Sequence, residues 1–223
     1  MLNYNTVPLF PSPVIQVKVD DDTSELLEYD DRDTTVSYST YVSTKQSGSN
    51  ERVLEKYPKT KNILLDTFTS VAEEVLGYKK RKYAITTSWI TKTKRGENSQ
   101  LHCHKNSFWS AVYYFQEEYP EGSGGILFDN PNTSAFDFAF QNSDIETLNE
   151  INGLACTFKP DPNVMLVFPS YLKHQVLTHQ NDTVRKSLAF NVVPTDPYGE
   201  HDSSYNQSWV TPSLGSWTSL KSK

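Results

Sequence analysis

The chain has 223 residues, enough to bury a sizeable core without a disulfide or a metal to stabilise it. Aromatic residues make up 13% of the sequence, and 27 acidic residues against 21 basic ones leave a net charge of −6. This acidic balance argues against a surface that binds the phosphates of nucleic acid. Two cysteines are too few for a disulfide framework, and residues 1–20 lack the basic start and apolar run of a signal peptide. No apolar run approaches 18 residues, so we expect a cytoplasmic protein without a membrane span.

The N-terminal part of the chain predicts two short strands and one helix. Residues 14–19 are rich in β-branched side chains and form one candidate strand, and residues 36–41 form a second. Apolar residues recur at helical spacing from Leu64 to Leu76, with Pro58 near the start and Gly77 at the position of a C-terminal cap.

From residue 83 onward the pattern changes to short strands rich in β-branched and aromatic residues. The candidates are residues 83–93, 100–104, 108–115, 125–128, 135–140, 155–158, 164–168, 172–178 and 185–193. Gly, Pro and Asn break them at fairly regular intervals, which is typical of a sandwich or barrel rather than of βαβ units. We therefore predict a mainly β fold.

Three histidines are candidate metal ligands. On a strand, His102 and His104 lie on one face about 7 Å apart, with Cys103 on the other, so both imidazoles can converge on one ion. Surface or core-edge histidines give the same pattern. His174 follows the apolar run 164–168, where a polar ring needs either a pocket or a hydrogen-bond partner.

Arg185 lies beyond a hairpin signal, the four-residue loop 179–182. In the register that this loop predicts, Val176 pairs with Arg185 and His174 with Ser187, and these four residues share one face. Arg185 then lies about 7 Å along the strands from the metal position. This separation suits a small dicarboxylate that chelates the metal and binds the guanidinium at its other end. A surface ion pair is the alternative.

Two neighbouring tyrosines, Tyr113 and Tyr114, lie in the candidate strand 108–115, and alternation lets only one of them face the pocket. A phenol there can donate a hydrogen bond to the far carboxylate of a ligand beside Arg185. The other tyrosine is expected in the core or at the surface.

The order of these motifs resembles the iron(II)- and 2-oxoglutarate-dependent oxygenases, most closely their small bacterial and phage branch. The motifs are His102-Cys103-His104, Ser110-Ala111-Val112-Tyr113-Tyr114-Phe115, Gly124-Gly125-Ile126-Leu127-Phe128-Asp129-Asn130-Pro131, Phe168-Pro169-Ser170-Tyr171-Leu172-Lys173-His174 and Arg185-Lys186-Ser187-Leu188-Ala189-Phe190-Asn191. The resemblance covers about residues 84–193, and residues 9–13 are similar to the usual start of that branch.

The resemblance implies a double-stranded β-helix, a cupin-like jelly roll, with a supporting helix in the N-terminal region. It implies a single domain over residues 1–223, with the β-helix core at about 84–193, strands and helix in 1–83 and an irregular tail in 194–223. The site would hold Fe(II), 2-oxoglutarate and O2, with a small molecule or a peptide as substrate.

The family's site residues map onto this chain as follows. His102 and His174 match the histidine ligands, Arg185 matches the residue that binds the C5 carboxylate of 2-oxoglutarate, and Tyr114 matches a tyrosine that assists it. Ser187 shares the predicted face with Arg185. His104 departs from the family, which carries Asp or Glu there; a three-histidine site is chemically possible because neutral imidazole suits iron(II). Asp129 is an alternative ligand on a different strand.

The implied activity couples the oxidative decarboxylation of 2-oxoglutarate, to succinate and CO2, with hydroxylation of a substrate. Peptidyl proline, as in prolyl hydroxylases, a free amino acid and another small metabolite stay open, as does the oligomeric state. Two other classes fit the residues: a cupin-type three-histidine metal enzyme that does not use 2-oxoglutarate, and a non-catalytic jelly-roll binding module.

Overall fold

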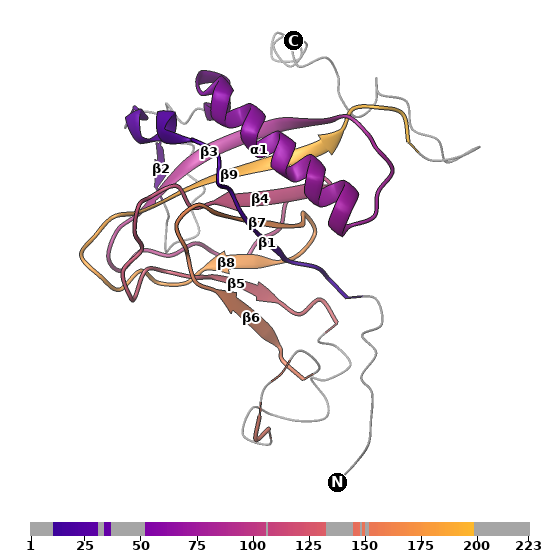
Figure 1. Cartoon of the computed structure of the whole chain (residues 1–223). Coiled ribbons are helices and arrows are strands. Elements are labelled where there is room, and N and C mark those ends of the chain that lie inside the picture. Colours follow the sequence, from indigo (N-terminus) through magenta and orange to yellow (C-terminus); the bar gives the residue numbers. More distant parts are fainter. Residues whose placement is uncertain are drawn as a thin grey trace, which may run out of the picture.

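The computed structural model describes residues 11–30, 34–36, 52–105, 107–132, 145–147, 149 and 152–198. Two β-sheets face each other, and helix α1 (Pro58–Ser70) covers the outer face of the larger one (Figure 1). The architecture is mainly β, as predicted.

The larger sheet has the strand order β1-β7-β4-β9-β3-β2. Its strands are β1 (Ile15–Lys18), β2 (Thr34–Val36), β3 (Tyr83–Thr93), β4 (Trp109–Tyr113), β7 (Val164–Pro169) and β9 (Arg185–Pro194). All neighbours are antiparallel except β2 and β3. Strands β4 and β7 are buried along their whole length because both faces of the sheet are covered, which explains their continuous apolar sequences.

The helix predicted around residues 64–76 is present, as α1 and the turn that follows it. Pro58 occupies the first turn of α1, which continues into the π-helical turn η4 (Val71–Val75), and Gly77 adopts a φ of +68° just beyond it. The short 3-10 helices η1 (Ser24–Glu28) and η3 (Val53–Lys56) lie on the same side. Phe68 is fully buried there and packs edge-on against Tyr83, with ring centroids 5.0 Å apart.

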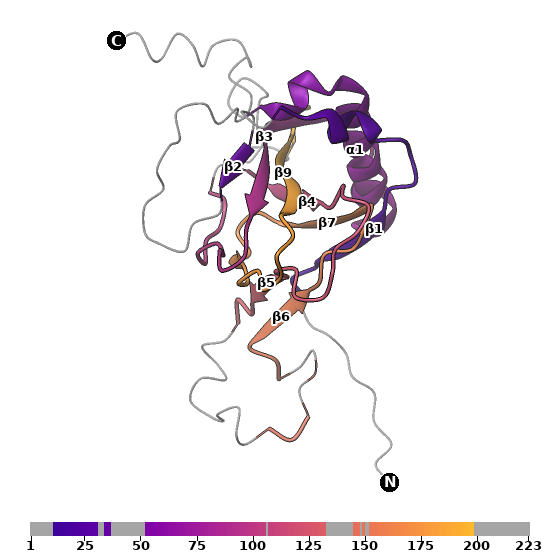
Figure 2. The ribbon, with the colours of Figure 1, turned by 90° about the vertical axis from the view of Figure 1, so that its left-hand side faces the viewer.

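The smaller sheet has the order β6 (Ala155–Phe158), β5 (Ile126–Asp129) and β8 (His174–Val176). It lies on the side of the larger sheet away from α1 (Figure 2). A second apolar cluster fills the space between the sheets and includes Val112, Tyr114, Ile126, Phe128, Leu166 and Phe168. Tyr114 and the other members of this cluster are therefore shielded from solvent.

Two predictions from the sequence are wrong. Residues 100–104 form no regular strand; His102 makes only an isolated bridge to His174. The hairpin register of residues 174–187 is also wrong, because β8 pairs with β5 in the smaller sheet whereas β9 pairs with β3 and β4 in the larger one. The segment between them crosses from one sheet to the other and is held by backbone hydrogen bonds from His179 to Glu97 and from Gly96 to His179.

The candidate strand 135–140 and the tail from residue 199 lie outside the described residues, as do residues 37–41 of the second candidate strand. Among the helices that the structure describes, none has the length and apolar character needed to cross a membrane.

Gly124 brings the chain before β5 close to the segment after β8. A Cβ at this position would lie 2.2 Å from the carbonyl oxygen of Leu177, a backbone atom that cannot swing away. We expect Gly124→Ala to lower the free energy of unfolding by at least about 2 kcal/mol in urea titrations. Ser123→Ala, which loses one hydrogen bond from Asn181, is the control and should cost about 1 kcal/mol or less. Equal losses in the two variants would show that the close approach is unimportant.

Candidate metal centre

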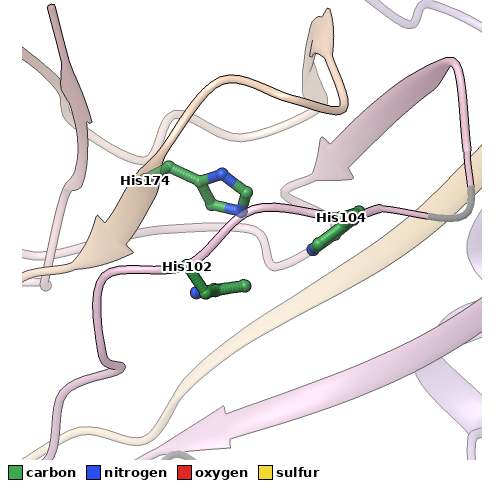
Figure 3. Close-up of side chains that lie close together, drawn as sticks. All are labelled: His102, His104 and His174. Carbon is green, nitrogen blue, oxygen red and sulfur yellow. The ribbon is translucent and has the colours of Figure 1, made fainter. Parts of the chain in front are cut away.

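Three histidines gather between the two sheets (Figure 3). His102, His104 and His174 each offer a ring nitrogen, and these atoms all lie within 4.8 Å of one another. The ring centroids are 4.4 to 5.3 Å apart. Nitrogens so grouped can bind one ion from one side and leave its other positions open.

Backbone hydrogen bonds hold the His-x-His segment against the smaller sheet. The amide of His102 donates to the carbonyl of His174 and the amide of His174 to the carbonyl of His102, each at 2.9 Å. The amide of His104 donates to the carbonyl of Ser170 at 2.8 Å. The cluster is therefore fixed by the main chain, without the regular strand that the sequence predicted.

Each imidazole is oriented through its Nδ1 atom. Nδ1–H donates to the carbonyl of Gln100 in His102, at 2.7 Å, and to the carbonyl of Leu172 in His174, at 2.9 Å. Because a carbonyl only accepts, these bonds select the tautomer with the lone pair on Nε2. Partners of this kind are the usual companions of metal-bound histidines, since they fix both the ring and its tautomer.

His104 is oriented by side chains of the larger sheet. Its Nδ1 lies 2.7 Å from Oδ1 of Asn191 and 2.8 Å from Oγ of Ser110. Ser110 also contacts Ser170 at 2.8 Å, and the amide of Asn191 donates to Thr87 at 2.8 Å. Sequence reasoning missed Asn191 and Ser110, although alternation along β9 places Asn191 on the same face as Arg185 and Ser187.

The electrostatics favour neutral rings. The pKa of His174 is lowered to about 3, mainly by burial and to a smaller extent by the nearby His102 and His104, while the Leu172 hydrogen bond opposes the shift. Burial also lowers the pKa of His104, with a smaller contribution from His102, while the Asn191 hydrogen bond opposes the shift. Neutral imidazole is the form that binds a metal ion, so these residues fit iron(II).

No carboxylate joins the cluster among the residues that the structure describes. Asp129, the alternative ligand, follows Phe128 on β5, and Phe128 is the residue whose ring faces His174. Alternation therefore directs Asp129 to the opposite face of the smaller sheet.

Arg185 lies buried at the start of β9, with 2% of its surface exposed. Its guanidinium donates to Oγ of Ser187 at 3.2 Å and lies over the ring of Tyr114, 5.3 Å from the centroid. No acidic side chain in the described part of the chain pairs with it. Arg185 and Tyr114 reach the space between the sheets from the larger sheet, and His174 reaches it from the smaller one. The two-residue spacing that the wrong hairpin predicted therefore does not apply.

Two buried polar atoms at this place, the Tyr114 hydroxyl and the Nε of Arg185 itself, make no hydrogen bond with the residues that the structure describes. Burial raises the pKa of Tyr114, although Arg185 opposes the shift, so the phenol is a donor. Tyr113 faces the helical side instead and bonds to Thr23 at 2.7 Å. Donors left unsatisfied in this way suit an anionic ligand.

A groove of about 590 Å³ lies next to His104. Its walls include the half-exposed rings of Tyr78, Phe108 and Tyr171, and Lys105 is among the lining residues. No described acidic side chain lines it.

The family described as "Putative 2OG-Fe(II) oxygenase" matches residues 87–191. This range contains the three histidines, Tyr114, Arg185 and Ser187. No curated protein matches the chain.

Three bacterial proteins are among the solved structures that match this chain. HygX from Streptomyces hygroscopicus, with nickel and 2-oxoglutarate bound, has a TM-score of 0.51 at 11% identity, with 83% of each chain covered. A Pseudomonas putida prolyl-4-hydroxylase has a TM-score of 0.45 at 14% identity, with 81% of this chain and 92% of that one covered. An oxidoreductase of the 2OG-Fe(II) oxygenase family from Burkholderia pseudomallei has a TM-score of 0.43 at 15% identity. The match covers 60% of this chain and 57% of the length of the Burkholderia protein.

At such identities the likeness to HygX concerns the fold, and it confirms the predicted jelly roll. The family match rests on the segment that carries the histidine cluster and the buried arginine. The resemblance that the sequence shows over about residues 84–193 is therefore confirmed by the 2OG-Fe(II) oxygenase family model, which matches residues 87–191.

Proposed function

We propose that this chain uses iron(II), 2-oxoglutarate and O2 to hydroxylate a substrate, with His102, His104 and His174 as the metal ligands. One observation carries the proposal: a fully buried guanidinium without a carboxylate partner among the described residues, in the same inter-sheet space as three histidines poised to bind a metal. HygX, of similar fold, holds nickel and 2-oxoglutarate.

The buried arginine favours a dicarboxylate cosubstrate over metal chemistry alone. Removing a guanidinium from water costs several kcal/mol unless an anion and further hydrogen bonds compensate. Arg185 and the Tyr114 hydroxyl can together supply donors to one carboxylate, with Ser187 holding the guanidinium in place. A three-histidine enzyme that binds no second carboxylate has no use for this arrangement.

The chain's own residues would divide the work between the two ends of the cosubstrate. The three Nε2 atoms would hold the metal, and the Nδ1 partners would fix the orientation and tautomer of the rings. Arg185 and Tyr114 would bind the far carboxylate of 2-oxoglutarate and so fix how its 2-oxo acid end approaches the metal. When bound, iron(II) supplies the activation of O2 that converts 2-oxoglutarate to succinate and CO2 and oxidises the substrate.

Apolar side chains would keep water from His174, the buried member of the three histidines. The rings of Phe128 and Phe168 lie against His174, with centroids 5.8 and 4.8 Å from that of the imidazole. Both belong to the cluster that fills the space between the sheets. Reactive species formed there would thus be separated from solvent on this side.

The groove beside His104 is our candidate for the substrate site. It borders a predicted metal ligand and exposes aromatic surface that a folded protein ordinarily buries. Because no described acidic side chain lines it and Lys105 does, a neutral or anionic substrate with apolar surface suits it.

Anaerobic titration tests the cosubstrate. Iron(II) should bind one per chain, and added 2-oxoglutarate should then produce a visible charge-transfer band. Arg185→Ala should raise the Kd of 2-oxoglutarate by about tenfold or more, since a charged hydrogen bond contributes about 1.5–3 kcal/mol. The control is Arg95→Ala, which removes an exposed arginine paired with Asp182.

Iron binding without any response to 2-oxoglutarate would favour the three-histidine enzyme that does not use this cosubstrate. Failure to bind iron would leave the non-catalytic module.

Protonation of His174 should make the metal-free fold sensitive to acid. The unfolded chain binds this proton near pH 6.5, whereas burial holds the pKa at about 3 in the folded state. Between these values the unfolded state binds more protons, so stability falls as the pH falls, by about 2 kcal/mol from pH 7 to pH 5. Urea unfolding at both pH values should show a smaller difference in His174→Gln. The same difference in both proteins would mean that His174 is not held neutral.

Substitutions in the groove should separate substrate binding from cosubstrate binding. Once a screen finds a compound that stimulates succinate formation, Tyr171→Ala should reduce the stimulation several-fold. Succinate formation without that compound, and iron(II) affinity, should stay within twofold of wild type. Unaltered stimulation in both Tyr171→Ala and Phe108→Ala would place the substrate elsewhere.

A further inference from the structure

The first residues of β9, which carry Arg185, lie beyond the end of β4. The two strands pair from Trp109 opposite Val192 to Tyr113 opposite Leu188, and there the ladder stops. On its other side β9 continues to pair with β3, down to Thr93 opposite Arg185. The backbone groups on both sides of Arg185 therefore need other partners on the β4 side.

Two side chains of the loop after β4 supply those partners. The Gln116 amide oxygen accepts from the Lys186 amide, and its nitrogen donates to the Val184 carbonyl at 3.1 Å. The Tyr119 hydroxyl donates to the backbone carbonyl of Lys186 at 2.7 Å and accepts from the backbone N–H of Gln116 at 3.2 Å. Gln116 and Tyr119 thus bind the main chain immediately before and after Arg185, as a neighbouring strand would.

Tyr119 also contacts the second cosubstrate-binding residue. Its ring packs edge-on against that of Tyr114, with the ring centroids 5.4 Å apart and the ring planes at 74° to one another. The Arg185 guanidinium lies over the ring of Tyr114. Burial raises the pKa of Tyr119, which keeps its hydroxyl a donor to Lys186. One side chain therefore contacts both the strand of Arg185 and the ring beneath its guanidinium.

We propose that Gln116 and Tyr119 are positioning residues for the far carboxylate of the cosubstrate, acting through Arg185 and Tyr114. The inference rests on the proposed function. The start of a strand paired on one side only is prone to fraying, and a shift of about 1 Å in a binding group is enough to weaken binding strongly. Gln116 and Tyr119 hold this strand end where the guanidinium and phenol meet one carboxylate.

A pair of ligands distinguishes positioning from general support of the fold. 2-Oxoglutarate and 2-oxopentanoate share the 2-oxo acid group that chelates a metal, but 2-oxopentanoate ends in a methyl group instead of the far carboxylate. Tyr119→Phe and Gln116→Met remove the hydrogen bonds with little change in size. Anaerobic titration of the iron(II)-loaded full chain gives Kd for each 2-oxo acid, and a separate titration gives Kd for iron(II).

In both variants we expect the Kd of 2-oxoglutarate to rise about five- to tenfold, while those of 2-oxopentanoate and iron(II) change less than twofold. In an Arg185→Ala background, Gln116→Met should weaken 2-oxoglutarate binding no further, because the Gln116 side chain bonds the strand that carries Arg185. Tyr83→Phe is the control. It removes a buried hydroxyl on the helical side of the sheet that makes no hydrogen bond among the described residues, and it should change none of the three Kd values.

Equal weakening of both 2-oxo acids would show a general structural role and overturn the inference. Unchanged 2-oxoglutarate binding in both variants would also overturn it, with the proposed function intact. If the wild-type protein does not prefer 2-oxoglutarate to 2-oxopentanoate, the proposed function itself fails.

Discussion

The reciprocal pair of backbone hydrogen bonds between His102 and His174 joins the two halves of the candidate metal centre. Residues 100–104 belong to no strand, so this bridge to β8 and the bond from His104 to Ser170, just after β7, fix their position. With the backbone fixed, each Nδ1 meets an oxygen and each Nε2 is left for a metal. Burial then keeps His104 and His174 neutral by lowering their pKa values. Ligand geometry, tautomer and charge state all depend on this docking of an irregular segment onto β8.

The larger sheet contributes the groups that would hold an anion. Strand β9 presents Asn191 to His104 and, toward its other end, Arg185 to Tyr114, with Ser187 accepting a hydrogen bond from the guanidinium. Because these residues are an even number of positions apart, they share one face of the strand. A small dicarboxylate that bridges the space between the sheets would thus meet neutral nitrogens at one end and a guanidinium at the other. The net charge of −6 makes the buried cation more informative, since an acidic chain would more readily pair an arginine with its own carboxylates.

The sequence predicted most strands and the helix because their patterns are local. The apolar run 164–168 is a strand buried on both faces, and the spacing from Leu64 to Leu76 is a helix buried on one face. Either pattern can be read from neighbouring residues alone. Loop length suggested a hairpin after His174, but it does not determine which sheet each flanking strand joins, and β8 and β9 join different ones. The grouping of His102 and His104 was predicted from strand alternation, whereas the structure reaches it through an isolated bridge. Gln116, Tyr119 and Ser110 were missed because side chains that bind distant backbone or imidazole groups leave no periodic pattern.

Among the described residues, no carboxylate joins the three histidines. The cluster therefore has less negative charge than a site made of two histidines and one acid. The hydrogen bonds at Nδ1 leave each Nε2 lone pair available, which is how three neutral rings can still bind a metal. X-ray absorption at the iron edge tests this most directly, because scattering from the outer imidazole atoms counts the histidines bound to the metal. In protein loaded with iron(II) without oxygen, three imidazoles should surround the metal, and two in His104→Ala. Two imidazoles in the wild-type protein, unchanged in His104→Ala, would contradict the three-histidine centre.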